Sequence, residues 1–126
     1  MTPEVAQAVE EVRAAFPGVV INVREEPDGG AVVFVESVDP GEQYQQRSTW
    51  IGFRITFQYP YSDVYPHFVR DDLARVDGAG LGEGMTVTTF EDRQAVQISR
   101  RSNKLNPAHD TAVIKLHKVL AWLRAR

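Results

Sequence analysis

The sequence predicts an α+β fold with an N-terminal helix, an antiparallel β-meander of about four strands and a C-terminal helix. Apolar residues recur at helical spacing near both ends of the chain, whereas apolar and polar residues alternate through its middle. Clusters of proline and glycine separate the alternating runs, as turns do. With 126 residues and 43% hydrophobic content, residues 1–126 can bury one core and form a single domain.

The first helix is predicted to follow Thr2, whose hydroxyl can cap it, with Pro3 at its first position. Pro17 and Gly18 then end the helix. Its apolar stripe consists of Val5, Val9, Val12 and Phe16. An apolar stripe this narrow is fully covered when the helix packs on a sheet, so we assign this helix no binding site.

The strands of the meander follow in order. Two apolar runs, Val19–Val23 and Ala31–Val38, flank a turn-forming segment and predict an antiparallel hairpin. The third strand begins near Trp50 and is the most regular, with the alternating apolar residues Phe53, Ile55, Phe57 and Tyr59. A short fourth strand is predicted at Phe68–Arg70. Two further β-prone runs are compatible with a small hairpin: Thr86–Phe90 and Gln94–Ile98.

The third strand runs into two Tyr-Pro pairs, within the stretch FRITFQYPYSDVYP that ends at Pro66. Pro60 ends the strand because proline lacks the N–H that a sheet ladder needs. Ser62, Asp63 and Pro66 then predict a compact loop of fixed shape. We expect this loop chiefly to support the fold and only secondarily to offer a contact surface.

The last helix is predicted over Thr111 to Leu123, capped by Asn106 with Pro107 or by Asp110. Its inner face is expected to comprise Ala112, Leu116, Val119, Leu120 and Leu123. The basic residues expected to point outward are Lys115, Lys118 and Arg124.

Composition excludes or disfavours several chemistries. The chain has no cysteine, which excludes disulfides, thiolate metal ligands and a thiol nucleophile. Asp71 and Asp72 favour ion pairs with Arg75 over a metal site, because no further ligand stands at metal spacing. The glycine-rich segment VDGAGLGEGM lacks the lysine of a phosphate-binding loop. We therefore expect neither a metal nor a cofactor.

The overall charge disfavours an extended polyanion as a partner. A net charge of -3 predicts affinity neither for nucleic acid nor for an anionic membrane surface. No apolar run approaches the roughly 20 residues of a membrane span. The start, MTPEVAQAVEE, is acidic and amphipathic, unlike a signal peptide. We expect a cytoplasmic protein.

One local basic cluster stands before the last helix, formed by Arg100, Arg101 and Lys104. Two interpretations are open for the arginines. Ion pairs with aspartates of the same chain are favoured, the candidates being Asp71, Asp72 and Asp77. The alternative is a site for an anion or an acidic partner.

The order of these elements resembles that of the ubiquitin-conjugating enzyme and RWD superfamily. The specific match is Tyr59-Pro60 followed by Tyr65-Pro66, which looks like the aromatic-proline and Tyr-Pro segment after the third strand of those proteins. The last predicted helix resembles the helix after their active-site region. The likeness in topology covers nearly the whole chain, and the specific motif is this one short segment.

The chain departs from the active members of that superfamily. They carry a catalytic cysteine that accepts a ubiquitin-like protein as a thioester, and an upstream His-Pro-Asn motif whose asparagine helps stabilise the oxyanion. By position the cysteine would fall near Ala95 to Ser99 and the motif between Gly78 and Phe90, and both are missing. The resemblance therefore implies a cysteine-less member, similar to bacterial ones linked to ubiquitin-like modification.

What the resemblance implies for function is a non-catalytic protein-binding module in or beside a ubiquitin-like protein modification system. Its partner would be a ubiquitin-like protein or the activating enzyme of that system. The predicted contact residues are Tyr61, Tyr65, His67, Arg100 and Arg101.

Two other functions remain open. An enzyme of unrelated chemistry would bring together Ser99, a histidine (His67 or His109) and an aspartate, which would be Asp71, Asp72 or Asp110. A structural subunit would instead form oligomers through an exposed apolar patch.

Overall fold

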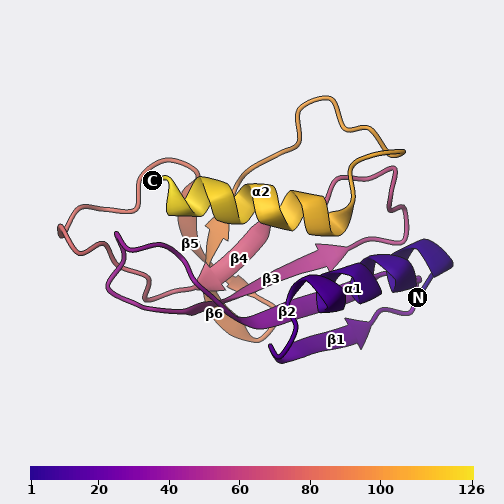
Figure 1. Ribbon diagram of the computed structural model, residues 1–126, viewed down its shortest axis with the longest axis horizontal. Coiled ribbons are helices and arrows are strands. Elements are labelled where there is room, and N and C mark those ends of the chain that lie inside the picture. The colour runs from indigo at the N-terminus through magenta and orange to yellow at the C-terminus, as the bar shows by residue number, and fades with distance from the viewer.

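The structure is a computed structural model that describes all residues from 1 to 126. Its elements follow in the order α1 (Pro3–Ala15), β1 (Ile21–Glu25), β2 (Ala31–Val38), β3 (Thr49–Ile55), β4 (His67–Arg70), β5 (Met85–Phe90), β6 (Arg93–Ile98) and α2 (Ala112–Arg124). The strands form one antiparallel sheet in the order β1-β2-β3-β4-β6-β5 (Figure 1). The α+β class is therefore as predicted.

The prediction of about four strands was too low, because the segment after residue 84 adds two strands to the sheet. β5 and β6 form the hairpin that the sequence allowed, and β6 pairs with β4, with Val69 opposite Val96. The other edge of β4 pairs with β3, with Val69 opposite Ile51. The hairpin is thus a continuation of the meander's sheet and not a separate ribbon.

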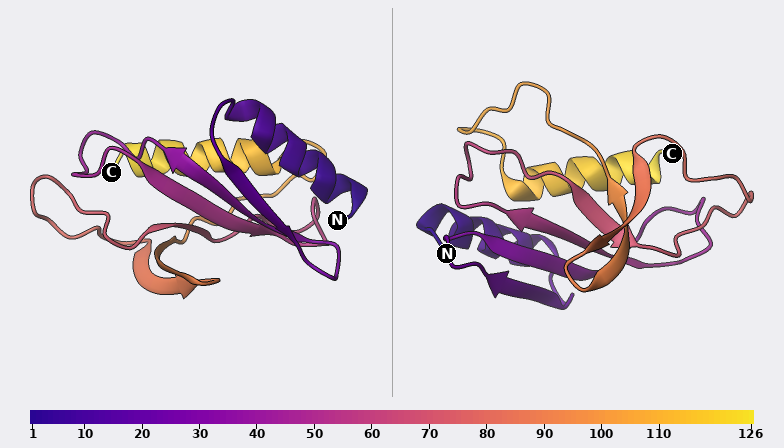
Figure 2. Two further views of the ribbon diagram at one scale, coloured as in Figure 1. Left: turned by 90° about the horizontal axis from the view of Figure 1, so that it is seen from below. Right: turned by 180° about the vertical axis from the view of Figure 1, so that it is seen from behind.

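Both helices lie on the same face of the sheet (Figure 2, left). Side chains alternate along a strand, so every second residue of β3 points toward the helices, namely Ile51, Phe53 and Ile55. The inner face of α2 is as predicted, with Ala112, Leu116, Val119, Leu120 and Leu123 all buried. One continuous core therefore fills the space between the helices and the sheet.

A smaller apolar cluster lies on the opposite face, where the β5–β6 hairpin curls beneath the sheet (Figure 2, left). The Phe90 ring stacks on Phe68 with the ring centroids 4.1 Å apart, and it lies 5.5 Å from the Phe34 ring. Gly52 makes room for these rings. A Cβ at Gly52 would lie 2.9 Å from the Phe34 ring and 3.1 Å from the Phe90 ring.

Ion pairs between distant strands hold the hairpin at this position. Glu91, in the turn between β5 and β6, accepts a hydrogen bond of 2.8 Å from Arg24 of β1 and pairs with Arg54 of β3. Arg93 of β6 pairs with Glu36 of β2, with nitrogen and oxygen 2.7 Å apart. These contacts join segments that are 37 to 67 residues apart in the chain.

β5 is one edge of the sheet, and its far side has no partner strand. Its sequence, MTVTTF, contains no charged residue and no proline. Val87 on this strand is 76% exposed. Charges and prolines are common means by which edge strands resist pairing with other chains, and β5 has neither.

The N-terminal helix agrees with the prediction. The Thr2 hydroxyl accepts a hydrogen bond of 3.1 Å from the Val5 N–H, and Pro3 is the first helical residue. Phe16 lies just beyond the last helical residue, and its ring stacks on His117 of α2 with centroids 5.7 Å apart. Each helix has 13 residues, and neither is long and apolar enough to cross a membrane.

The third strand is shorter than its alternating pattern predicted. It ends at Ile55, so Pro60 does not end the strand as predicted. Pro60 lies in the second of two successive turns, which are closed by the Tyr59 N–H donating to the Thr56 carbonyl and the Tyr61 N–H donating to the Gln58 carbonyl. Phe57 is consequently 49% exposed, whereas Tyr59 is buried. The Tyr59 hydroxyl accepts a hydrogen bond of 3.0 Å from the Ala112 N–H, at the start of α2. The first Tyr-Pro pair thus supports the body of the fold; both Tyr-Pro peptide bonds are cis.

Two other local predictions were wrong. Thr111 caps α2, its hydroxyl accepting from the Ile114 N–H at 3.2 Å, so neither Asn106 nor Asp110 is the cap. Those two residues instead form a turn, in which the Asp110 carboxylate accepts from the Asn106 N–H.

The prediction that Arg75 pairs with Asp71 or Asp72 was also wrong. Asp72 pairs with Arg70, and Arg75 pairs with Asp77 at 3.2 Å. Each arginine therefore binds the carboxylate two residues further along the chain, within its own exposed turn.

Candidate functional site: a basic pocket beside α2

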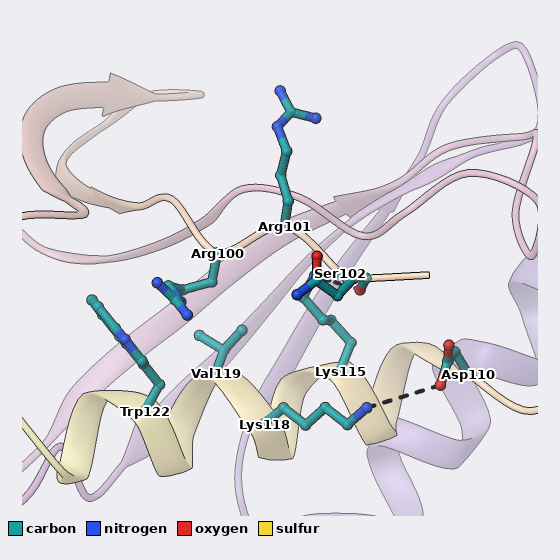
Figure 3. Close-up of a pocket in the computed structure, with 9 residues that line it drawn as sticks. Arg100, Arg101, Ser102, Asp110, Lys115, Lys118, Val119 and Trp122 are labelled. Atoms are coloured by element: carbon teal, nitrogen blue, oxygen red, sulfur yellow. Dashed lines mark hydrogen bonds and ion pairs between the residues drawn. The ribbon is translucent and has the colours of Figure 1, made fainter. Parts of the chain in front are cut away.

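A pocket of about 350 Å³ lies between the segment after β6 and one flank of α2 (Figure 3). Residues 100–103 form one wall and α2 forms the other. Four of its lining side chains are cationic, and they are Arg100, Arg101, Lys115 and Lys118. Its other lining residues are Ser102, Asn103, Asp110, Val119 and Trp122, so the base is partly apolar. We call this site the basic pocket.

Arg100 and Arg101 carry charges that no carboxylate of the chain neutralises, since none lies within 4.0 Å of either guanidinium. The favoured prediction, pairing with Asp71, Asp72 or Asp77, was therefore wrong. Asp72 and Asp77 pair instead with Arg70 and Arg75, and Asp71 forms no ion pair with either arginine.

The two arginines point in different directions (Figure 3). The Arg100 guanidinium reaches toward α2 and lies 5.0 Å from the centroid of the Trp122 ring. The Arg101 guanidinium points away from α2 and lies 4.1 Å from the centroid of the Tyr65 ring. Arg100 is thus a wall of the pocket, whereas Arg101 extends its positive charge toward the Tyr-Pro loop.

The Trp122 ring also contacts the guanidinium of Arg126. Arg126 lies 4.3 Å from the same indole ring and donates a hydrogen bond of 3.0 Å to the Leu81 carbonyl. Cation–π contacts of this kind stabilise a partly exposed arginine by roughly 0.5–1 kcal/mol. Trp122 therefore restricts Arg100 in the absence of any partner, which lowers the entropy lost when an anion binds.

Lys115 is buried, which corrects the prediction that it points outward. Its ammonium lies 3.0 Å from both carboxylate oxygens of Asp63 and donates to the Ser102 hydroxyl at 2.8 Å. The Ser102 N–H and hydroxyl also donate to Asp63, each at 2.7 Å. This cluster joins the Tyr-Pro loop, the segment before α2 and α2 itself, so it fixes the inner end of the basic pocket.

The Asp63 carboxylate stays ionised in this cluster. Burial alone would raise its pKa, but the two Ser102 hydrogen bonds and the Lys115 ammonium outweigh burial and lower the pKa. Asp63 thereby neutralises the Lys115 charge within the cluster. The surplus positive charge of the pocket comes from the remaining cations.

Lys118 contributes a cation at the mouth of the pocket. Its side chain is 68% exposed, and its ammonium lies 3.9 Å from Asp110, a distance too long for a hydrogen bond (Figure 3). The pocket and its supporting cluster together set four cations against the two carboxylates of Asp63 and Asp110. The site is thus electropositive in a chain whose net charge is -3.

The five predicted contact residues do not lie on one surface. Tyr61 is 79% exposed at the tip of the Tyr-Pro loop. Tyr65 is partly buried beneath Arg101, and this pair links the loop to the basic cluster. Tyr65, Arg100 and Arg101 are therefore brought together.

His67 is fully buried, so we remove it from the contact surface. It is the first residue of β4 and lies on the sheet face that packs against the helices, where its ring is 5.2 Å from Phe53. Neither ring nitrogen has a hydrogen-bond partner. Burial lowers its pKa to about 3, so the imidazole is neutral at physiological pH.

The groups proposed for an unrelated enzyme are not assembled. The Ser99 hydroxyl accepts a hydrogen bond of 3.0 Å from the Gln97 side chain, and no histidine or aspartate bonds to it. His67 has no hydrogen-bond partner at all. The contact between Ser102 and Lys115 is not a nucleophile and base either, because Asp63 accepts from both side chains.

The sequence interpretation missed Lys115, Asp63 and Trp122 as parts of the site. A signal was present for Lys115, since it stands three residues after Ala112 and four before Val119, both on the inner face of α2. Asp63 and Trp122 had no such signal. Their roles depend on contacts between segments far apart in the chain, such as the 52 residues that separate Asp63 from Lys115.

In comparisons with known proteins, no family model, curated protein or solved structure matches this chain.

Proposed function

We propose that this chain is a ubiquitin-conjugating-enzyme-like domain that acts as a non-catalytic protein-binding module in or beside a ubiquitin-like protein modification system. The order of its elements and the two Tyr-Pro pairs after β3 support the resemblance. The absence of cysteine supports a non-catalytic role, because thioester transfer requires a thiol. The partner is a ubiquitin-like protein or its activating enzyme.

The observation that carries a binding role is the pair of unneutralised arginines beside the basic pocket. Structural arginines in folded domains are commonly paired with carboxylates of the same chain, as Arg70, Arg75 and Arg93 are here. Arg100 and Arg101 are held by aromatic rings and leave their hydrogen-bond donors free. Arginines are enriched in protein interfaces for this combination of planar stacking and open donors.

The experiment that tests this proposal is affinity capture of the tagged chain from its own cells, followed by mass spectrometry of bound proteins and of covalent adducts. Recovery of a ubiquitin-like protein or its activating enzyme, without an adduct, is the expected result. An adduct on Ser99 or on a lysine would contradict a non-catalytic role.

A charge-matched pair of variants tests the surface. Arg100→Glu with Arg101→Glu should reduce partner recovery about tenfold or more, because two interface cations become repulsive. The control is Arg47→Glu with Lys104→Glu, which changes the total charge equally at two exposed residues outside the pocket. Equal loss in both double variants would mean that only total charge matters, and no loss in either would remove the basic pocket from the interface.

A further inference from the structure

The basic pocket has a shape and a charge distribution that suit a particular chemical group. Two of its four cations, Arg100 and Lys118, come from opposite walls, one from the segment after β6 and one from α2, whereas Arg101 points away from α2 (Figure 3). The partly exposed Trp122 ring supplies the apolar surface at the base, and the buried Val119 lies beneath it in α2. A group bound here would meet a guanidinium on one side, an ammonium on the other and apolar surface below.

We propose that the basic pocket binds a carboxylate carried by an extended segment of the protein partner. This inference rests on the proposed function and specifies what the partner presents. The Arg100 guanidinium has a planar fork of N–H donors that matches the two oxygens of a carboxylate. Lys118 supplies a second cation, which Asp110 holds only loosely at 3.9 Å.

The charges around the pocket favour a single negative charge over a larger one. Asp63 neutralises Lys115, and Asp110 lies beside Lys118, so each of these cations already has a carboxylate nearby. The uncompensated charge that points into the pocket is that of Arg100, which matches one carboxylate. Beyond about 8 Å at physiological ionic strength charge is largely screened, so a short segment responds to the local cations and not to the net charge of -3.

The volume of the basic pocket suits a small chemical group that belongs to a longer peptide. About 350 Å³ lies at the lower end of the range of pockets that hold small molecules. The wall of residues 100–103 is exposed along most of its length, so a peptide can continue past the pocket toward Arg101. Arg101 and Tyr65 would then contact the neighbouring residues of that segment.

Two sources of the carboxylate are possible within one peptide, an acidic side chain and the C-terminal carboxylate. Three probes distinguish them: acetyl-Gly-Gly-Glu-Gly-Gly-amide, acetyl-pentaglycine with a free C-terminus, and acetyl-pentaglycine amide, which has no charge. Inorganic phosphate is a fourth probe for a free anion. Two-dimensional amide NMR spectra of the whole chain, recorded at low salt during each titration, locate and quantify binding.

The expected result is saturable shifts at residues 100–103 and in the middle of α2 with at least one carboxylate peptide, and none with the uncharged peptide. Arg100→Gln and Lys118→Gln should each weaken that binding about tenfold or more, because each removes a charge-assisted hydrogen bond. The matched control is Lys104→Gln, a nearby exposed lysine that does not line the pocket and should leave the affinity unchanged.

Three outcomes would overturn the inference. They are equal shifts with the uncharged peptide, tighter binding of phosphate than of either carboxylate peptide, and shifts that lie away from the pocket. If the peptides fail while partner capture still depends on Arg100 and Arg101, the carboxylate inference fails and the proposed function stands. If the peptides bind while capture recovers no protein of a ubiquitin-like modification system, the carboxylate inference stands and the proposed function fails.

Discussion

His67 is a titratable side chain that folding removes from water. Burial lowers its pKa to about 3, and the nearby Lys115 ammonium acts in the same direction, while Asp63 opposes both. In the unfolded chain a histidine has a pKa of about 6.5. Below that pH the unfolded state takes up a proton that the folded state excludes. The folded state therefore loses stability as the pH falls from about 6.5 toward 3.

Replacing His67 with leucine should remove this dependence. Between about pH 6 and pH 4 we expect the wild-type chain to lose roughly 1.4 kcal/mol more per pH unit than His67→Leu. Urea unfolding at a series of pH values measures the difference. Carboxylates with a lowered pKa, such as Glu36, destabilise both proteins alike as they become protonated. Parallel pH profiles would mean that His67 gains a proton in the folded protein.

Gly52 is the second residue whose identity the structure constrains. Gly52→Ala should lower the free energy of unfolding by about 1–2 kcal/mol, because its Cβ would lie 2.9 Å from the Phe34 ring and force the aromatic cluster apart. Gly80→Ala is the matched control, since a Cβ there meets nothing within 4 Å. Chemical denaturation of both variants checks the prediction, and equal stabilities would show that the rings move aside at no cost.

At the scale of elements, the first turn of α2 depends on two acceptors from different parts of the chain. Thr111→Ala should cost about 1 kcal/mol of stability by removing the cap of the Ile114 N–H. Tyr59→Phe should cost about 1–2 kcal/mol, because the buried Ala112 N–H loses its acceptor. Tyr61→Phe controls for the loss of a phenol, since its ring is 79% exposed. Thermal unfolding measures these losses. Equal loss of stability in Tyr61→Phe and Tyr59→Phe would contradict the role of the Tyr59 hydroxyl as the acceptor of the Ala112 N–H.

Most elements were predictable because their signals are local. The cap and apolar stripe of α1 are encoded within one short segment, and so is the apolar run AVVFV that begins β2. The end of β3 was not predictable in this way. Its alternation continues through Phe57 in the sequence, but β4 pairs only with residues 51–53, and the chain leaves the sheet at Ile55. The sixth strand likewise depends on pairing between β4 and β6.

The candidate site was predictable only in part, for the same reason. Arg100 and Arg101 stand out in the sequence as a local basic cluster. That they remain unpaired depends on the tertiary positions of the aspartates, two of which, Asp72 and Asp77, pair with Arg70 and Arg75 within short turns. Burial of His67 follows from which face of β4 meets the helices, and no local pattern in so short a strand specifies that.

At the scale of the whole molecule, the two tryptophans lie in different layers. Trp50 packs against the outer aromatic cluster, whereas Trp122 lies on α2 at the basic pocket. Ion pairs and strand pairing connect these layers, so we expect one cooperative unfolding transition. The variant Trp50→Phe leaves Trp122 as the only tryptophan, and its fluorescence should follow the same urea unfolding curve as circular dichroism. The variant Trp122→Phe leaves Trp50 as the only tryptophan, and we expect the same agreement there. Separate midpoints in Trp122→Phe would mean that the β5–β6 hairpin unfolds on its own.

The open edge of β5 has a consequence for the protein in concentrated solution. Six residues without charge or proline, with Val87 exposed, are a template on which another β-strand can add, and repeated addition produces aggregates. Val87→Lys should raise the concentration at which light scattering first appears and change the unfolding free energy by less than about 0.5 kcal/mol. An unchanged threshold would mean that this strand is not where self-association begins.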